Sequence, residues 1–198
     1  MFAFTNFRAY CTNFFAHINV FKTVAFVALF IAAGLAGRIP VPGTPVGITM
    51  QTFVLMLAAF YLSQAEGITA LGSYITLGAL GLPVFSGGVS TAALIGPSAG
   101  FIWGFIPAFV ISHCFIQGFA QAAQKAQIPY FAYTAALFVS LAVGSIAFLY
   151  IFGVTIQSFL THTPWVPLMN ASFIFVLGDC IKAIFAVIIA QNLKFSTK

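Results

Sequence analysis

The sequence contains very little charge. Of its 198 residues only 5% are charged and only two are acidic, whereas 62% are hydrophobic. Soluble globular domains carry about 25% charged residues, and the few charges present here cannot cover a water-exposed surface of this size. The composition excludes an ordinary water-soluble fold and indicates a protein that is solvated mainly by lipid.

Several sequence patterns are also missing. The seven Lys and Arg residues are scattered singly, so there is no basic patch that would bind nucleic acid. Cys11, Cys114 and Cys180 form no CxxC pair. We interpret them as small buried hydrophobes and expect no disulfide framework, no metal site and no cofactor. A loop of the form G-x-x-x-x-G-K-[ST] is absent, so the sequence contains no P-loop for ATP, and any ATPase that acts with this chain must be a separate protein.

Long apolar runs are the main positive signal. A membrane-spanning helix needs about 20 mainly apolar residues, and four runs qualify. These runs are 20–37, 97–119, 131–152 and 168–190. Two shorter runs, 50–62 and 68–82, form either a buried hairpin or two short spans. The turn between them contains Glu66, which is costly at bilayer depth, so we place it at a water interface. We therefore predict an all-α integral membrane protein with six transmembrane helices.

The basic residues predict the orientation of these helices. With the N-terminus in the cytoplasm, Arg38 is the only basic residue on the outer side. The basic residues on the cytoplasmic side are then Arg8, Lys22, Lys125, Lys194 and Lys198. Both termini should therefore face the cytoplasm. We divide the chain into 1–19, an interfacial segment and not a cleaved signal peptide, 20–192, the six-helix domain, and 193–198, a cytoplasmic tail.

One pair of charges lies inside an apolar run. Asp179 and Lys182 fall about midway along 168–190, and their i, i+3 spacing places both on one helical face. They form either a structural ion pair or the floor of a ligand pocket. Because ionisable groups within lipid are costly, we favour the pocket. An acceptor beside a donor suits a urea-like or amide group, whose N–H donates to the Asp and whose C=O accepts from the Lys.

Two loops rich in Gly and Pro, about 38–49 and 81–100, lie on the outer side. Each is either a plain turn or a cover over a pocket, and we favour a cover because glycine lets the backbone approach a ligand closely. On the first helix Ala28, Ala32 and Ala36 repeat at four-residue spacing, which permits close helix contact. This stripe either packs inside the protein or docks a membrane partner.

Five groups of motifs together resemble a known family. They are GTPV at 43–46 with ITMQT at 48–52, Tyr74, GLPVF at 81–85 with Gly87 and Gly88, GPSAGF at 96–101, and GDCIKA at 178–183. In this order and spacing they resemble the biotin-binding S components of energy-coupling-factor (ECF) transporters, the BioY family. The match extends over about residues 20 to 192.

The resemblance implies a function and a set of partners. Members are six-helix proteins of the prokaryotic cytoplasmic membrane that bind biotin near the outer face. Asp179 and Lys182 correspond to residues that contact the ureido ring, and Gln51 and Tyr74 lie in the matching motifs, so we include them among the ligand contacts. The partners would be a transmembrane T component, contacted through the alanine stripe, and two ATPase subunits. The chain itself would not be an enzyme.

The chain also departs from the family pattern. Members often have Pro-Ile-Thr where this chain has Gly47-Ile48-Thr49, and Gly-Gly-Tyr where it has Ala99-Gly100-Phe101. Some members hold the carboxylate of the ligand with a basic residue after that aromatic, which is Ile102 here, or with an Asn in the glycine loop. The available donors for a carboxylate in this chain are Ser90, Thr91, Arg38 and the amides that open the helix at Pro97.

Rival functions follow from other patterns. Residues 96–100 match G-x-S-x-G, so an intramembrane hydrolase with Ser98 as nucleophile is one alternative. Its base would be His113, about four turns away on the same helix, or His162 in an outer loop. A Pro before the Ser is more simply explained as a helix start. A channel would show polar residues along several spans as a path, whereas the strong charges here lie on one helix only. An S component for another small vitamin also remains an alternative.

Overall fold

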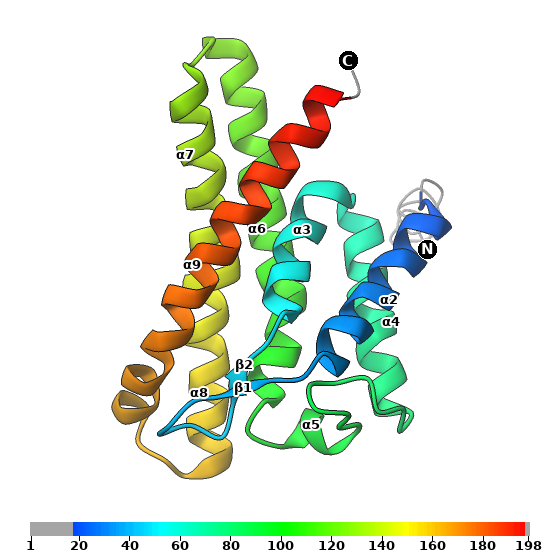
Figure 1. Cartoon of the computed structure of the whole chain (residues 1–198), viewed down its shortest axis with the longest axis vertical. Helices are drawn as coiled ribbons and strands as arrows, with labels where there is room; N and C mark the ends of the chain where they lie inside the picture. Colours follow the sequence, from blue (N-terminus) through cyan, green and yellow to red (C-terminus); the bar gives the residue numbers. More distant parts are fainter. Residues whose placement is uncertain (1–17, 197–198) are drawn as a thin grey trace, which may run out of the picture.

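The structure, a computed structural model, describes residues 18–196. Residues 1–17, which make up most of the expected interfacial segment, and residues 197–198 lie outside the described residues. The described chain is a bundle of helices (Figure 1), in which α2 begins and α9 ends towards the same end. A short hairpin and two loops lie at the opposite end.

Eleven elements are formed between residues 18 and 196. They are α2 (Val20–Leu35), β1 (Ile39–Pro40), β2 (Gly47–Ile48), α3 (Gln51–Tyr61), α4 (Gln64–Ala79), α5 (Ala92–Ile95), α6 (Ala99–Ala126), α7 (Tyr130–Leu141), the π-helical segment η1 (Ala142–Phe148), α8 (Leu149–Thr161) and α9 (Trp165–Ser196). Because η1 joins α7 and α8 into one helix, the described residues make six helical passes along the bundle.

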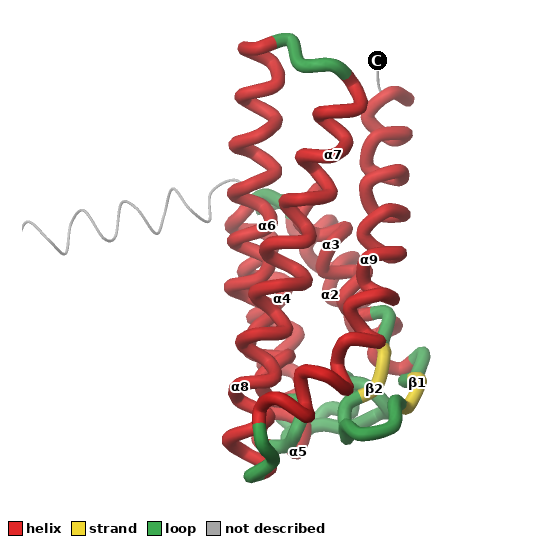
Figure 2. Tube along the Cα trace, turned by 90° about the vertical axis from the view of Figure 1, so that its left-hand side faces the viewer, coloured by secondary structure: helices red, strands yellow, loops and turns green. Residues whose placement is uncertain are grey.

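The helices differ in length. Three stretches among the described residues are long and apolar enough to cross a membrane, namely Ala99–Ala123, Tyr130–Thr161 and Trp165–Asn192. The helices α2 and α3 are apolar but shorter, at 16 and 11 residues. Figure 2 shows that α6, α7 and α9 extend beyond the turn between α3 and α4. The bundle is therefore taller on one side than on the other.

The end of α6 lies beyond the apolar run that predicted this helix. The run 97–119 predicts a helix that in the structure continues to Ala126. It ends where Gln127 adopts a left-handed conformation with φ 48°, two residues before Pro129, which cannot continue a helix. Polarity marks where a chain leaves an apolar environment, whereas backbone conformation decides where a helix ends. The run of apolar residues therefore underestimates the helix.

The turn between α3 and α4 is fixed by Glu66. The Ser63 hydroxyl accepts from the Glu66 amide at 3.3 Å, and Glu66 Oε2 accepts from the Ser63 amide at 2.8 Å, which is a capping box. The other oxygen, Oε1, accepts from the backbone N–H of Asn19 at 2.9 Å. Glu66 is only 5% exposed. One acidic side chain thus joins the start of α4 to the start of α2.

Close helix contacts hold the centre of the bundle. Gly144 in η1 lies against α6, where an added Cβ would come 2.6 Å from Ser112 N and 2.9 Å from Ala108 O. The buried hydroxyls of Ser112 and Ser145 hydrogen-bond at 2.8 Å across the same contact. A π-helical turn changes which face the following residues present. The segment η1 ends just before Leu149 and Tyr150, both of which are buried.

The hairpin and loops cover one end of the bundle. Strands β1 and β2 pair antiparallel, with Ile39 opposite Ile48. The loop that follows α4 docks on α2, because the Gly87 amide donates to Gly34 O at 3.3 Å and a Cβ on Gly34 would lie 2.6 Å from Val84 O. Figures 1 and 2 place the hairpin and α5 at the same end. The two loops expected to share one face therefore do so.

Candidate functional site

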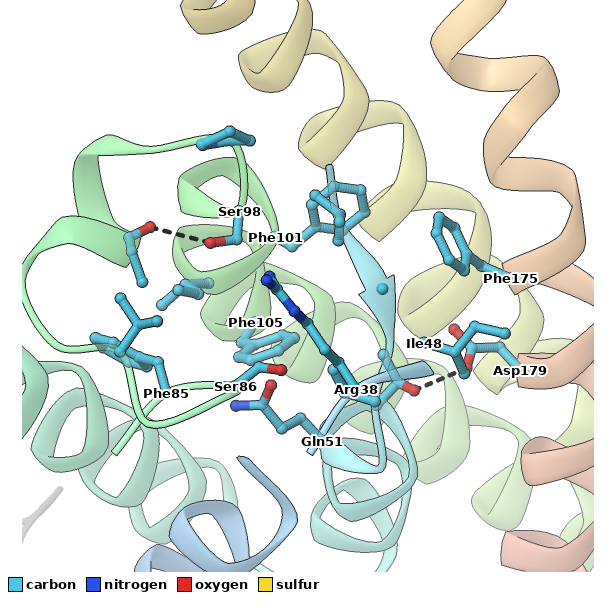
Figure 3. A pocket seen from close by; sticks show the side chains of 18 of the residues that line it. Arg38, Ile48, Gln51, Phe85, Ser86, Ser98, Phe101, Phe105, Phe175 and Asp179 are labelled. Atoms are coloured by element: carbon cyan, nitrogen blue, oxygen red, sulfur yellow. Dashed lines mark hydrogen bonds between the residues drawn. The ribbon is translucent and has the colours of Figure 1, made fainter. Parts of the chain in front are cut away.

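A cavity of about 230 Å³ lies beneath the hairpin and the loops. Its size is slightly below that of sites for drug-sized ligands, so it suits a compact small molecule. Its lining residues come from the hairpin, both loops, α3, α5, α6, α8 and α9. They are Arg38, Val46, Gly47, Ile48, Thr49, Gln51, Thr52, Phe85, Ser86, Val89, Ala92, Ala93, Pro97, Ser98, Phe101, Ile102, Phe105, Tyr150, Phe175, Asp179 and Lys182. Figure 3 shows how several of these side chains converge.

The Asp179–Lys182 pair lines this cavity. Lys182 Nζ lies 2.7 Å from Asp179 Oδ1, and their side chains are 13% and 2% exposed. Both residues come from α9, as their spacing predicts. The two side chains form an ion pair and also line the cavity. The geometry is therefore compatible with both interpretations, a structural ion pair and a pocket floor.

Lys182 uses all three of its protons within the protein. Besides Asp179, its ammonium donates to Thr49 O at 2.6 Å and to Thr52 Oγ1 at 3.0 Å. An ammonium has three donors and no acceptor. A ligand carbonyl that accepts from Lys182 must therefore replace one of these internal partners, which the spacing of Asp179 and Lys182 alone did not indicate.

Asp179 keeps capacity to accept a further hydrogen bond. Its Oδ1 accepts from Lys182 and from Thr52 Oγ1 at 2.7 Å, while Oδ2 accepts only from the Tyr150 hydroxyl, at 2.7 Å. Each carboxylate oxygen has about two acceptor positions. Asp179 Oδ2 is therefore the atom best placed to accept an N–H from a ligand.

Thr52 and Tyr150 are site residues that sequence reasoning missed. Thr52 belongs to the matched motif at 48–52 and directly follows Gln51, so the sequence could have indicated that it contributes to the site. Tyr150 lies near the end of the apolar run 131–152, and its sequence context gave no indication of a role in the site. Its ring packs edge-on against Phe101 at 5.8 Å and stacks with Phe175 at 6.3 Å between centroids. The cavity is thus polar at Asp179 and aromatic beside it.

Gln51 and Tyr74 occupy different positions. Gln51 lines the cavity, and its Nε2 donates to the Tyr74 hydroxyl, which in turn donates to Val84 O at 3.1 Å. Tyr74 is fully buried and is not among the lining residues. It lies behind Gln51 and connects that side chain to the loop after α4. Its position is that of a supporting residue.

The expected carboxylate donors divide into two groups. Ser90 and Thr91 do not line the cavity, and the Thr91 hydroxyl instead bonds the carbonyl of Gly78 at 3.3 Å. Arg38 and Pro97 do line it. A further polar group that sequence reasoning overlooked is the Ser86 hydroxyl, which lines the cavity and is buried without a hydrogen-bond partner.

The alanine stripe faces outward. Ala28, Ala32 and Ala36 are all exposed, whereas Ala33, on the neighbouring face of α2, is 7% exposed and belongs to the core. Exposed apolar side chains, including Leu29 at 46%, flank the stripe. The stripe is therefore available for contact with lipid or with another protein and is not part of internal packing.

The geometry does not support a serine hydrolase. The Ser98 hydroxyl donates to Ala93 O at 3.3 Å, and the cavity lining drawn from the described residues includes no histidine. His113 Nδ1 instead pairs with Ala59 O at 3.1 Å in the bundle interior. Over residues 18–196 there is also no group of three His, Cys, Asp or Glu side chains that could hold a metal.

These features define a class: a helical protein with membrane-spanning helices and a covered cavity whose polar floor is an Asp–Lys pair. Comparison with known proteins agrees. The model of the BioY family matches residues 10–198, and the chain belongs to that family.

Named relatives extend over most of the chain. A protein named "Biotin transporter BioY" from Thermotoga maritima is 32% identical over 180 residues, covering 89% of this chain and 95% of the relative. A protein of the same name from Rhizobium etli is 30% identical over 170 residues, covering 85% and 89%. The crystal structure of the S-component for biotin from an ECF-type ABC transporter superposes with a TM-score of 0.78 at 24% identity, covering 88% of this chain and 89% of that one. This last likeness concerns the fold.

Proposed function

We propose that this protein is the biotin-binding S component of an ECF transporter and delivers biotin across a prokaryotic cytoplasmic membrane. The observation that carries this proposal is the Asp179–Lys182 pair on the floor of the covered cavity, with Asp179 Oδ2 still able to accept a bond. A ureido N–H donates to Asp179, and the ureido C=O accepts from Lys182 in place of an internal partner. The relatives named as biotin transporters support the choice of ligand.

The remaining ligand contacts follow from the lining. Gln51 contacts the ligand from α3, while Tyr74 acts by holding Gln51 in place. Aromatic side chains beside Tyr150 cover the apolar part of the ligand. Ser90 and Thr91 lie away from the cavity, and Thr91 acts by holding the covering loop through its bond to Gly78 O rather than by direct contact.

We propose six membrane spans with both termini in the cytoplasm. Lys22 lies near the start of α2 and Lys125 near the end of α6, towards the end of the bundle where α2 begins and α9 ends. Arg38 directly precedes β1, which lies towards the opposite end (Figure 1). This distribution follows the positive-inside rule. The cavity then opens to the outside, where the ligand is captured.

Transport by this protein requires partners. Ala28, Ala32 and Ala36 contact a transmembrane T component, because exposed small residues allow helices to approach closely in lipid. Two ATPase subunits supply the energy.

Direct binding tests the ligand assignment. Labelled biotin is titrated into the purified protein in detergent, with other vitamins as unlabelled competitors. Saturable binding that only biotin displaces supports the proposal. Displacement by a different vitamin, with no effect of biotin, identifies an S component of other specificity, and absence of any binding rejects the assignment.

A further inference from the structure

Arg38 is a cation without a counterion. It precedes β1 and lines the cavity, and within the described part of the chain its guanidinium has neither an ion pair nor a hydrogen bond. Figure 3 shows its side chain reaching across the cavity towards Phe101 and Ser98, away from Asp179. Arg38 is exposed, so it lines the cavity at its rim, where a guanidinium offers five donors to a ligand that enters.

The charge balance of the cavity points to an anionic ligand group. The whole sequence contains two acidic side chains. Asp179 is paired with Lys182, and Glu66 is bonded to the amides of Asn19 and Ser63 in the turn between α3 and α4. Neither acid is paired with Arg38, so an exposed guanidinium without a carboxylate partner lines the cavity at the end away from Asp179.

Gly47 lets the backbone of Ile39 and the stem of Arg38 approach β2 closely. It stands opposite Pro40 in the strand pair, and an added Cβ would lie 2.7 Å from Ile39 O and 3.1 Å from Arg38 Cβ. The backbone at Gly47 does not have positive φ, so conformational freedom does not explain the glycine. Its role is to let the stem of Arg38 pass close to β2. The arginine and the glycine are thus one local arrangement.

We infer that Arg38 holds the carboxylate of the ligand and sets the specificity for an acid over its neutral derivatives. This inference rests on the proposed function, because it assigns the second end of the same ligand. With the ureido ring at Asp179, the acidic chain runs along the aromatic side towards the guanidinium. Arginine matches a carboxylate through two parallel N–H···O bonds. Because Arg38 adjoins the hairpin, the same contact fixes this cover over the occupied cavity.

The test compares biotin with its primary amide, biotinamide, which keeps the ureido ring and lacks the negative charge. Titration calorimetry on the full-length protein in detergent gives the affinity ratio of the two ligands. For the unaltered protein we expect biotin to bind about 10- to 100-fold more tightly than the amide, the range of a charged hydrogen-bonded pair. Arg38→Gln should lower the affinity for biotin by a similar factor and leave that for the amide nearly unchanged.

Two further variants separate the possible outcomes. Arg38→Lys should restore part of the preference for biotin, because it keeps the charge and loses the two-bond geometry. Asp179→Asn should weaken both ligands by the same factor and keep their ratio. The inference is wrong if Arg38→Gln weakens acid and amide equally or changes neither. If the unaltered protein binds neither ligand, the proposed function itself fails, which is a different result.

Discussion

The hydroxyl of Tyr150 donates to Asp179 Oδ2, the carboxylate oxygen that Lys182 does not contact. Tyr150 therefore fixes the orientation of the Asp179 carboxylate from one side while Thr52 and Lys182 fix it from the other. A carboxylate held on both oxygens cannot rotate away from the cavity. The acceptor that we assign to the ureido ring is thus oriented before the ligand arrives.

Tyr150→Phe should weaken biotin binding about tenfold, because it removes one hydrogen bond to a charged group and keeps the ring packed between Phe101 and Phe175. Titration calorimetry measures the change. In the background of Asp179→Asn the same substitution should have much less effect, since the two residues act as a unit. Additive effects in the double variant would show that Tyr150 acts independently of Asp179.

Asp179→Asn and Lys182→Met should each weaken biotin binding by several kcal/mol. Each change removes one member of a buried pair and leaves the other charge without its partner. Monodisperse elution and an unchanged helical spectrum must show that the variants are folded. If both folded variants bind biotin as tightly as the original protein, the pair has a purely structural role.

Ala32→Trp should leave biotin binding by the isolated protein intact and lower biotin uptake in cells that depend on the complete transporter. Ala32 is exposed on α2, and a bulky ring there prevents close approach of a partner helix. Ile174→Trp on α9 is a matched control, because Ile174 is also exposed, at 52%, and lies outside the stripe. Equal losses of uptake in both variants would remove the alanine stripe from the mechanism.

Gly144→Ala should destabilise the fold by about 1–3 kcal/mol, because its Cβ would be forced against the backbone of α6 at Ala108 and Ser112. Gly118→Ala, also within a helix but with nothing within 4 Å of the added Cβ, should be neutral or stabilise by up to about 1 kcal/mol. Thermal unfolding in detergent, followed by circular dichroism, compares the two. Similar melting temperatures for both variants would contradict the packing argument.

The sequence predicts the helices through composition. The six apolar runs overlap α2, α3, α4, α6, α9 and the continuous helix from α7 to α8. They do not predict η1, because a π-helical turn arises from packing between helices and leaves no mark on hydropathy. Nor do they predict that Glu66 binds the amide of Asn19, since that contact joins residues 47 positions apart. The interface placement of Glu66 followed from its charge alone.

The candidate site is predictable only in part. Asp179 and Lys182 stand out because charge is rare within apolar runs. Thr52 and Tyr150 do not stand out, because hydroxyl-bearing side chains are common in such helices and only the three-dimensional arrangement brings these two to Asp179. Ser90 and Thr91 were expected in the cavity because the sequence places them in the covering loop. The sequence does not indicate the direction in which that loop turns, and in the structure neither residue lines the cavity.

The three internal partners of Lys182 also bear on how the ligand departs. Because Thr49 O, Thr52 Oγ1 and Asp179 Oδ1 satisfy the ammonium within the protein, a group of the protein itself can take the place of a ligand that leaves. The departing molecule then does not leave a bare cation behind, and its exit does not wait for water to enter the floor of the cavity. Because the same groups compete with the ligand for the ammonium, they ease its release at some cost in affinity. Such a compromise suits a protein that must bind its ligand and then pass it on.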